Sequence, residues 1–317
     1  MSPGSNDPTS LLERETLAAK KPNLRLRAGL LQAIRHFFAE KNYLEVETPY
    51  LIPAPAPEFH IDAIRAGEGF LHTSPELCMK RLLAAGYPRI FQTCKCFRQG
   101  ERGSRHLPEF TLLEWYRAET DYLDLMEECE EMVAFVLEEL GLQPLLEFQG
   151  RTLDLQRPWH RMTVHEAFER YAPTSLERAM ESRRFDEILA FEIEPSLGFP
   201  KPVFLYQYPS SLAALARLSK EAPGYGERFE LYVAGVELAN AFSELTDPVE
   251  QRERFEQELA RRKDRGKAVY AVPEKFLRCL PFMPESAGIA LGVDRLVMLL
   301  SNQKEIDPAV SFTPEEL

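Results

Sequence analysis

The sequence has 317 residues, 44% hydrophobic and 28% charged, enough to bury a large core as one big domain or one domain with an insertion. Its 38 Lys and Arg against 50 Asp and Glu give a formal net charge of −12. This charge disfavours a non-specific polyanion binder, because Lys and Arg contacts to phosphates supply most of that affinity.

The five cysteines form no CxxC pair, so neither a disulfide framework nor a zinc site is expected. No apolar stretch reaches membrane-spanning length, and the first residues lack the apolar core of a signal peptide. The sequence therefore predicts a cytoplasmic protein with no membrane partner.

The first part of the chain predicts a helix, a strand and a proline break. Residues 1–10 are small and polar and are expected to be disordered. Apolar residues recur at helical spacing from Leu24 to Glu40, and the next segment alternates through Leu44 and Val46 until Pro49.

A second helix is expected in FLHTSPELCMKRLLAAG. Thr73 or Ser74 suits the N-cap, Pro75 the first helical position and Gly86 the stop. Glu76 has two interpretations: it complements the helix dipole, or it binds a cationic ligand.

The segment from Arg89 to Arg117 predicts a long β-hairpin, with strands over Ile90–Phe97 and Phe110–Tyr116. Strand alternation places Gln92, Cys94, Cys96 and Arg98 on one face of the first strand, and Phe110, Leu112, Glu114 and Tyr116 on one face of the second. One face of the hairpin thus offers a guanidinium, an aromatic ring, a carboxylate and a phenol.

An edge hairpin with a solvated basic loop is the simpler interpretation of this segment. Against it, Glu114 stands among apolar neighbours, where a carboxylate is costly unless it binds a cation. The loop also collects Arg98, Arg102, Arg105 and His106, as expected for a site that holds a polyphosphate beside an amino group.

The middle of the chain is less informative. Leu123 to Leu140 predicts an acidic amphipathic helix, ended by Gly141 and exposed at the surface. Residues 145–218 carry no chemical motif that we can interpret.

Two carboxylates stand seven residues apart in GVELANAFSELTD, at Glu237 and Glu244, with Asn240 between them. They would lie on opposite faces of a regular strand, so a shared site requires a helical turn or a bulge near Asn240. The alternative is two exposed acids.

The last informative stretch, SAGIALGVDRLVMLL, predicts a strand with Ala290 and Gly292 that leads into a helix with Arg295 in its first turn. A glycine-rich junction of this kind is by itself weak evidence of phosphate binding.

Three of these stretches, in this order, resemble the three signature motifs of class II aminoacyl-tRNA synthetases of the lysyl type. The second, FRQGERGSRHLPEFTLLEWY, is the most specific, and the resemblance covers about residues 24 to 300. It implies an α+β fold with an antiparallel sheet flanked by helices, and a homodimer formed through the first motif.

The resemblance also implies roles for single residues, with ATP as a substrate and Mg²⁺ as the metal. Arg98 and Arg295 would be catalytic, and Glu237 and Glu244 would be metal ligands. The amino acid would contact Ser74, Glu76, Glu114, Tyr116, Asn240, Glu244 and Ala290. The nucleotide would contact Arg98, Glu101, Arg105, His106, Phe110, Glu237, Gly292 and Arg295.

Two departures from the family pattern fall in the hairpin loop. Arg98-Gln99-Gly100-Glu101 displaces the usual acid by one residue, and Leu107 replaces an amide that normally helps to hold the nucleotide.

The segment before the first motif, residues 1–23, is expected to be an extension, and residues 24–317 a catalytic domain without an anticodon-binding domain. The resemblance is therefore closest to stand-alone paralogues that attach lysine or β-lysine to a lysine of translation elongation factor P. Ala290 agrees, because lysyl-tRNA synthetases usually have Gly there. We expect elongation factor P as the acceptor, met by the basic loop around Arg102 and Arg105, and not tRNA. The alternative is a truncated lysyl-tRNA synthetase.

Overall fold

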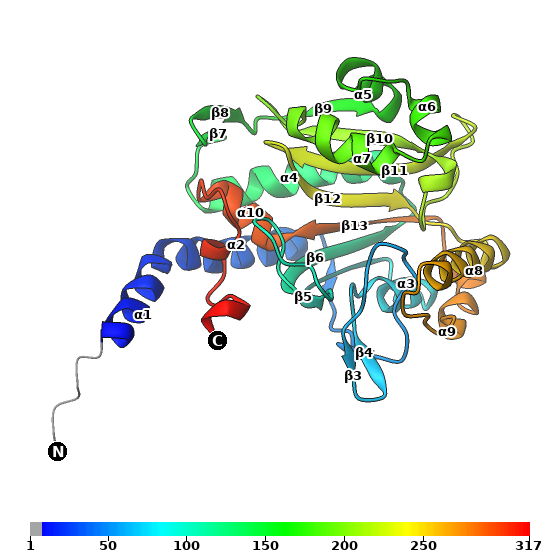
Figure 1. Ribbon diagram of the computed structural model, residues 1–317, viewed down its shortest axis with the longest axis horizontal. Helices are drawn as coiled ribbons and strands as arrows, with labels where there is room; N and C mark the ends of the chain where they lie inside the picture. The colour runs from blue at the N-terminus through cyan, green and yellow to red at the C-terminus, as the bar shows by residue number, and fades with distance from the viewer. Residues whose placement is uncertain (1–7) are drawn as a thin grey trace.

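The computed structural model describes residues 8–317, and for residues 8–12 only the backbone. Its centre is an eight-stranded sheet (Figure 1). Across the sheet the strands follow in the order β1 (Leu44–Glu45), β5 (Arg89–Phe97), β6 (Glu109–Ala118), β13 (Ser286–Gly292), β12 (Val236–Ser243), β11 (Tyr225–Val233), β10 (Val203–Pro209) and β9 (His160–Thr163).

The six central strands are antiparallel, whereas each outer strand runs parallel to its neighbour, β1 to β5 and β9 to β10. The expected α+β fold is confirmed. Two small sheets accompany the large one, formed by β2 (Leu51–Ile52), β4 (Gly69–Leu71) and β3 (Arg65–Ala66), and by β7 (Leu145–Phe148) and β8 (Arg151–Asp154).

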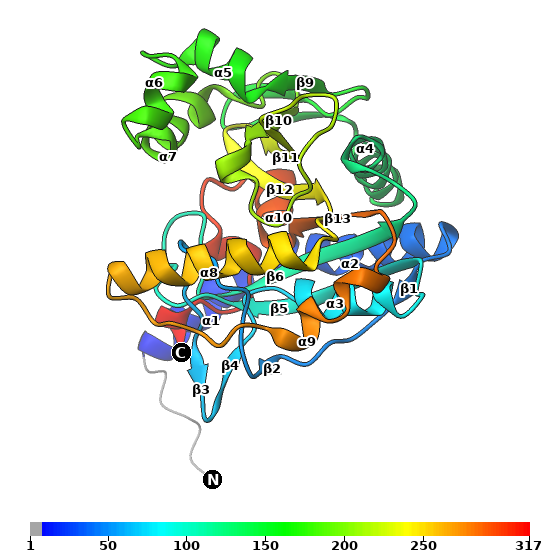
Figure 2. The same cartoon turned by 90° about the vertical axis from the view of Figure 1, so that its right-hand side faces the viewer.

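The helices divide between the two faces of the sheet (Figures 1 and 2). One face packs against α2 (Lys21–Glu40), α4 (Tyr122–Glu139) and α10 (Val293–Leu300), and forms the largest hydrophobic core. The other face is flanked at β5 by α3 (Glu76–Ala84), α8 (Pro248–Asp264) and α9 (Glu274–Leu277), and at β10 by α5 (Val164–Tyr171), α6 (Leu176–Glu181) and α7 (Phe185–Ile188).

Helix α4 departs from its sequence interpretation as a surface element. It begins after Asp121, whose side chain accepts hydrogen bonds from the backbone N–H groups of Leu123 and Asp124 at 2.8 and 3.1 Å. Its apolar face, including Met126 and Met132, is fully buried against the sheet. The many acidic residues of this helix suggested a surface position, although its apolar face packs in the core.

Residues 8–10 were expected to be disordered, but they belong to a helix. This helix, α1, spans Pro8–Ala19 and projects from the body of the molecule (Figure 1). Residues 1–7 lie outside the described residues. Lys20 then donates to Glu316 at 2.6 Å, which joins the start of α2 to the end of the chain. The boundary at residue 23 stays a prediction.

No helix within residues 8–317 is both long and apolar enough to cross a membrane.

Gly288, in the central strand β13, is required by close packing. A Cβ atom at this position would lie 2.2 Å from Tyr116 Cε1 and 2.6 Å from Glu244 Oε1. Both distances are shorter than any stable contact, so a side chain here must displace its neighbours.

We therefore expect Gly288→Ala to lower the melting temperature. Overpacking of a core costs about 1–3 kcal/mol, and each kcal/mol shifts the melting temperature of a larger domain by about 2–4 °C. Gly292→Ala is the matched control, because its added Cβ would lie 3.5 Å from the Arg295 side chain, an ordinary contact. Equal melting temperatures in the two variants, measured by calorimetry, would contradict this packing argument.

Candidate active site

Strand register brings four of the polar positions into rows across the sheet. Glu114 pairs with Ala290, Ala290 with Asn240, and Asn240 with Glu230. In the next row, Tyr116 pairs with Gly288. Since residues paired across strands point to the same face, these side chains share the face that α8 and α7 flank.

This face carries a cavity of about 530 Å³, a volume typical of small-molecule sites. With one exception, the residues predicted for the site line it: Ser74, Glu76, Arg98, Glu101, Arg105, His106, Phe110, Glu114, Tyr116, Glu237, Asn240, Ala290, Gly292 and Arg295. The exception is Glu244, which lies behind Gly288 and is 1% exposed.

Glu114 is the centre of one end of the cavity. It is buried, and it accepts hydrogen bonds from Ser74 Oγ at 2.7 Å and from Tyr116 Oη at 2.9 Å. Burial, together with the nearby carboxylate of Glu76, raises the pKa of Glu114 to about 8. A carboxylate in this environment favours a cationic ligand.

The same end holds two further carboxylates. Lys80, which is buried, forms ion pairs with Glu76 at 2.5 Å and with Glu244. Although burial alone would lower the pKa of Lys80, these two carboxylates raise it, so Lys80 stays charged. Glu76 and Glu244 thus share the single ammonium of Lys80, and together with Glu114 they suit a ligand with amino groups.

Arg98 lies toward the other end of the cavity. Its guanidinium carbon lies 4.9 Å from the centre of the Phe110 ring, and Nη1 is 3.8 Å from Glu101 Oε2. Its Nε is buried and has no hydrogen-bond partner within residues 8–317. A buried cationic donor left free in a cavity is suited to an anionic oxygen.

Arg295 extends this positive region. It donates to the backbone oxygen of Glu237 at 2.6 Å, and its Nη2 lies 2.8 Å from His106 Nε2. Burial and the charge of Arg295 lower the pKa of His106, so the neutral imidazole accepts this hydrogen bond. Arg105 donates to the backbone oxygen of Gly235 at 2.6 Å and also lines the cavity.

The expected bulge near Asn240 is present. Leu231 pairs with Ala239, and Tyr232 pairs with Glu237, which leaves Leu238 as the extra residue. The bulge turns Glu237 to the same face as Asn240.

The expected metal pair of Glu237 and Glu244 is nevertheless wrong. The chain between them is almost entirely the extended strand β12. Seven residues of strand at about 3.3 Å each place the two carboxylates about 20 Å apart, and one ion cannot bind both. Glu244 instead belongs to the carboxylate end with Lys80.

The carboxylate that lies near Glu237 is Glu230, which sequence reasoning missed. Strands β11 and β12 form a hairpin through Ala234 and Gly235, with φ of 53° and 72°. Tyr232 lies directly opposite Glu237, and Glu230 is the next residue on the same face. A strand ending in Ala-Gly before a second strand is the signal that could have revealed this pairing.

Three side chains donate hydrogen bonds to Glu230, and one of them comes from residues 145–218, the segment without a recognisable motif. It accepts hydrogen bonds from Tyr208 Oη at 2.5 Å, Tyr232 Oη at 2.7 Å and Arg228 Nη2 at 2.6 Å. The neighbouring carboxyl is that of Glu194. Burial, together with the nearby carboxylates of Glu230 and Glu237, raises the pKa of Glu194. Residues 145–218 therefore contribute to the site through Tyr208 and Glu194.

The two departures in the hairpin loop have structural explanations. Leu107 is buried in the main hydrophobic core, where an amide would need a partner. Gly100 has φ of +77°, in the left-handed region that favours glycine.

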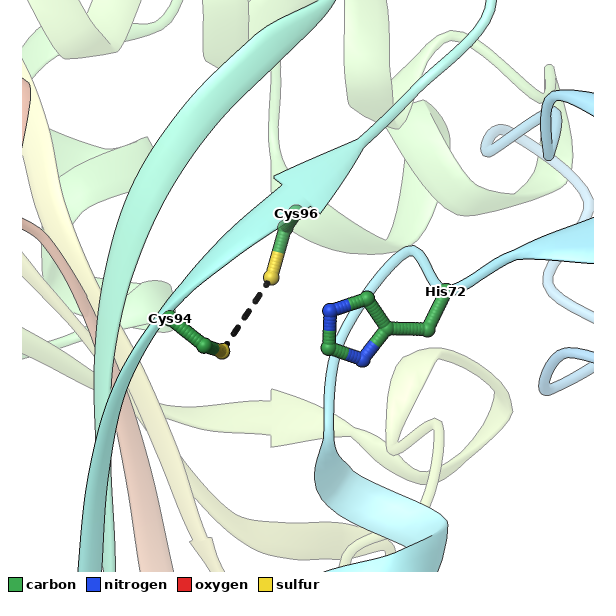
Figure 3. A group of neighbouring side chains, drawn as sticks. All are labelled: His72, Cys94 and Cys96. Atoms are coloured by element: carbon green, nitrogen blue, oxygen red, sulfur yellow. Dashed lines mark hydrogen bonds between the residues drawn. The ribbon is translucent and has the colours of Figure 1, made fainter. Parts of the chain in front are cut away.

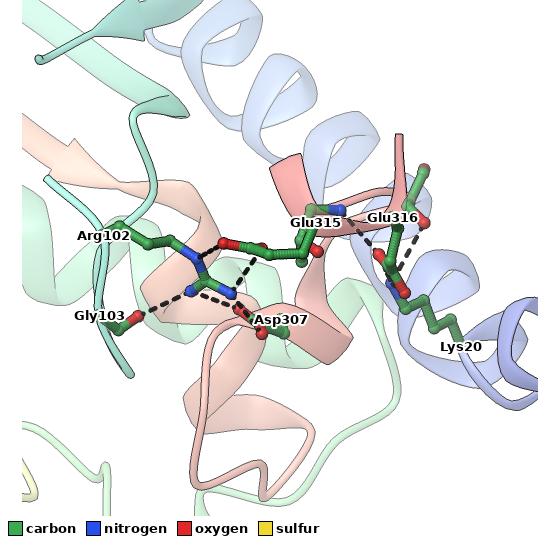
Figure 4. Close-up of polar contacts among 8 residues, drawn as sticks. Lys20, Arg102, Gly103, Asp307, Glu315 and Glu316 are labelled. Atoms are coloured by element: carbon green, nitrogen blue, oxygen red, sulfur yellow. Dashed lines mark hydrogen bonds and ion pairs between the residues drawn. The ribbon is translucent and has the colours of Figure 1, made fainter. Parts of the chain in front are cut away.

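The loop around Arg102 does not present free positive charge, which corrects the expected docking surface. Arg102 donates to both oxygens of Asp307, at 2.8 and 3.0 Å, and to both oxygens of Glu315, at 2.9 and 3.0 Å (Figure 4). Arg105 is turned into the cavity. The loop is thus attached to the C-terminal segment.

The chain is similar to known proteins over almost its whole length. Residues 12–316 match the family described as tRNA synthetases class II (D, K and N). The chain is 39% identical over 314 residues to the elongation factor P--(R)-beta-lysine ligase of Salmonella gallinarum (strain 287/91 / NCTC 13346), covering 93% of this chain and 96% of that protein.

Two further relatives carry the same name. The ligase of Enterobacter sp. (strain 638) is 38% identical over 312 residues, covering 93% of this chain and 96% of its own length. That of Pectobacterium carotovorum subsp. carotovorum (strain PC1) is 39% identical over 318 residues, covering 94% and 97%. The fold, the cavity and these similarities together show that this chain belongs to the class II tRNA synthetase family.

Proposed function

We propose that this protein activates lysine or β-lysine with ATP as the aminoacyl-adenylate and transfers it to a lysine of translation elongation factor P. The observation that carries the proposal is the charge distribution of one cavity. Glu76, Glu114 and Glu244 make one end anionic, whereas Arg98 and Arg295 make the other cationic.

The carboxylate end suits the two amino groups of such a substrate. Glu114 and Glu76 line the cavity, and Glu244 lies directly behind Gly288. Ser74 and Tyr116 fix both oxygens of Glu114, which prepares it to receive an ammonium group without reorganisation. Ala290 and Asn240 line the wall beside it.

In the first step, a carboxylate oxygen of the amino acid attacks the α-phosphorus of ATP, and the bond to pyrophosphate breaks. Arg98, with its free Nε, would stabilise the charge on the α-phosphate, and Arg295 that on the departing phosphates. In the second step, the lysine amine of the acceptor attacks the acyl carbon, loses a proton, and AMP leaves. Phe110 offers a face for the adenine ring.

Glu237 and Glu230 would hold a magnesium ion. Glu237 is 39% exposed in the cavity, and Glu230 lies near it on the same face. Two carboxylates and phosphate oxygens are the usual ligands of Mg²⁺, which when bound would neutralise phosphate charge.

Elongation factor P as the acceptor is supported by the names of the relatives and by the net charge of −12, which disfavours tRNA.

The homodimer and the cytoplasmic location remain part of the proposal. Leu44, Tyr50 and Leu51 are 51%, 46% and 58% exposed near the sheet edge, as a subunit contact requires. Sedimentation equilibrium would show a monomer if this surface is unpartnered.

The function is tested by parallel transfer of labelled lysine and β-lysine to purified elongation factor P and to lysine tRNA from the same organism. We expect ATP-dependent label on the protein and little or none on tRNA. Efficient charging of tRNA with no label on elongation factor P would instead identify a truncated lysyl-tRNA synthetase.

Binding of the amino acid should release protons near neutral pH. The pKa of Glu114 is raised to about 8, so its carboxyl is largely protonated at pH 7, whereas an ammonium ligand requires the carboxylate. Affinity should therefore rise with pH and level off above about pH 8. Calorimetry in buffers of different ionisation enthalpy measures the release, and proton uptake on binding would refute the assignment. Glu114→Gln should abolish the release.

The proposed metal site contains Glu237 but not Glu244, although both were predicted from the sequence as metal ligands. We expect Glu237→Gln to raise the Mg²⁺ concentration needed for half-maximal pyrophosphate exchange, because one ligand is lost. Glu244→Gln should raise the KM for the amino acid and leave the Mg²⁺ requirement unchanged, because it removes charge from the other end of the cavity. Identical Mg²⁺ titrations of wild type and Glu237→Gln would exclude Glu237 as a ligand.

A further inference from the structure

A second cluster of reactive side chains lies beside the active site and has no part in the proposed reaction. Cys94 and Cys96 occupy alternate positions of β5, so their side chains share one face, and His72 faces them from the segment between β4 and α3 (Figure 3). All three residues are at most 4% exposed. Their nitrogen and sulfur atoms lie within 4.8 Å of one another.

The hydrogen bonding of His72 prepares one ring nitrogen to bind a ligand. Nε2 lies 2.6 Å from the backbone oxygen of Lys95, so this nitrogen carries the proton and donates. Nδ1 is therefore a free acceptor, and it is buried without a hydrogen-bond partner within residues 8–317. Histidines that bind metals almost always donate their other N–H to a carbonyl or carboxylate in this way. In Figure 3 Nε2 is the ring nitrogen on the side of the two sulfurs, so binding through Nδ1 requires the ring to turn toward them.

The spacing of the two sulfur atoms suits a metal ion better than a disulfide. Tetrahedral Zn²⁺ with Zn–S bonds of about 2.3 Å separates two sulfurs by about 3.8 Å, and Cys94 Sγ lies 3.9 Å from Cys96 Sγ. A disulfide needs about 2.05 Å, and Cβ atoms about 3.8 Å apart. Residues i and i+2 of a strand lie about 6.6 Å apart with parallel side chains, so a disulfide would distort β5.

The surroundings can also supply the charge and the fourth ligand. Metal binding displaces the protons of cysteine thiols, so Cys94 and Cys96 would both bind as thiolates. Gln92 is the preceding residue on the same face, is 2% exposed, and its Oε1 accepts no hydrogen bond within the described residues. Two thiolates would neutralise a divalent cation, and Gln92 would add an oxygen ligand.

We propose that His72, Cys94 and Cys96 form a structural Zn²⁺ site. The ion would link two parts of the chain, the segment just before Ser74 and Glu76 and the strand β5 just before Arg98. It would thus connect the backbone that positions the two ends of the cavity. No zinc site was expected from the sequence, because the two cysteines form no CxxC pair and the histidine precedes them by more than twenty residues.

The test uses the full-length protein without a histidine tag. Zn²⁺ is added under reducing conditions, the excess is removed by gel filtration, and bound metal is measured by mass spectrometry. We expect about one Zn²⁺ per chain in the wild type, retained in Cys78→Ser and lost in Cys96→Ser and His72→Gln. Cys78 is the matched control, because it is a free cysteine outside the cluster.

Two measurements on the wild type keep the test decisive if a variant fails to fold. Co²⁺ in place of Zn²⁺ should give the near-ultraviolet absorption of thiolate ligation, and Zn²⁺ should protect two thiols from alkylation. A wild-type chain that retains no Zn²⁺, that retains as much as folded Cys96→Ser, or that loses two thiols to a Cys94–Cys96 disulfide instead of binding metal would overturn the proposal.

Discussion

The site depends on the register between β6, β13, β12 and β11. Backbone hydrogen bonds between these strands place Glu114, Ala290, Asn240 and Glu230 in one row, although Glu114 is more than a hundred residues from the other three in sequence. A slip of one residue in any strand would turn its side chains into the hydrophobic core beneath. The core formed with α2, α4 and α10 therefore fixes the active site, because it fixes which face each strand buries.

The site keeps carboxylates at one end of the cavity and guanidinium groups at the other, so that they do not neutralise one another. Glu114 and Glu244 are buried, Glu76 is partly buried, and Lys80 pairs with Glu76 and Glu244, so ionisation of Glu114 is costly until a cationic ligand arrives. At the other end, Arg295 is held by Glu237 and His106, while Arg98 keeps a free donor. Such a cavity selects ligands that carry amino groups on one side and phosphates on the other.

Much of this was predictable from the sequence where the pattern is local. Strand alternation predicted which residues of the β5–β6 hairpin share a face, and the structure pairs these faces, with Gln92 opposite Glu114 and Cys96 opposite Phe110. A bulge near Asn240 was named only as a condition for a site shared by Glu237 and Glu244; the bulge is present, and it turns Glu237 to the face of Asn240.

Non-local contacts were not predictable. Glu244 was misplaced because its partner Lys80 lies in a distant helix, whereas Glu230 was missed although its hairpin pairing with Asn240 is local and is marked by Ala234 and Gly235. The charge of Arg102 appeared free until the C-terminal carboxylates were located. Pattern analysis gives the face of a side chain, whereas the neighbour that compensates its charge depends on the tertiary fold.

The central claim is that the buried carboxylates select an amino acid by its second amino group. It is tested most directly by ATP–pyrophosphate exchange with lysine, β-lysine and norleucine, which has the four side-chain carbons of lysine but lacks the terminal amine. A site built to bind an amine rejects an analogue that lacks it by about 10⁴-fold or more. We therefore predict exchange with lysine or β-lysine and none above background with norleucine. Comparable exchange with norleucine would contradict the account.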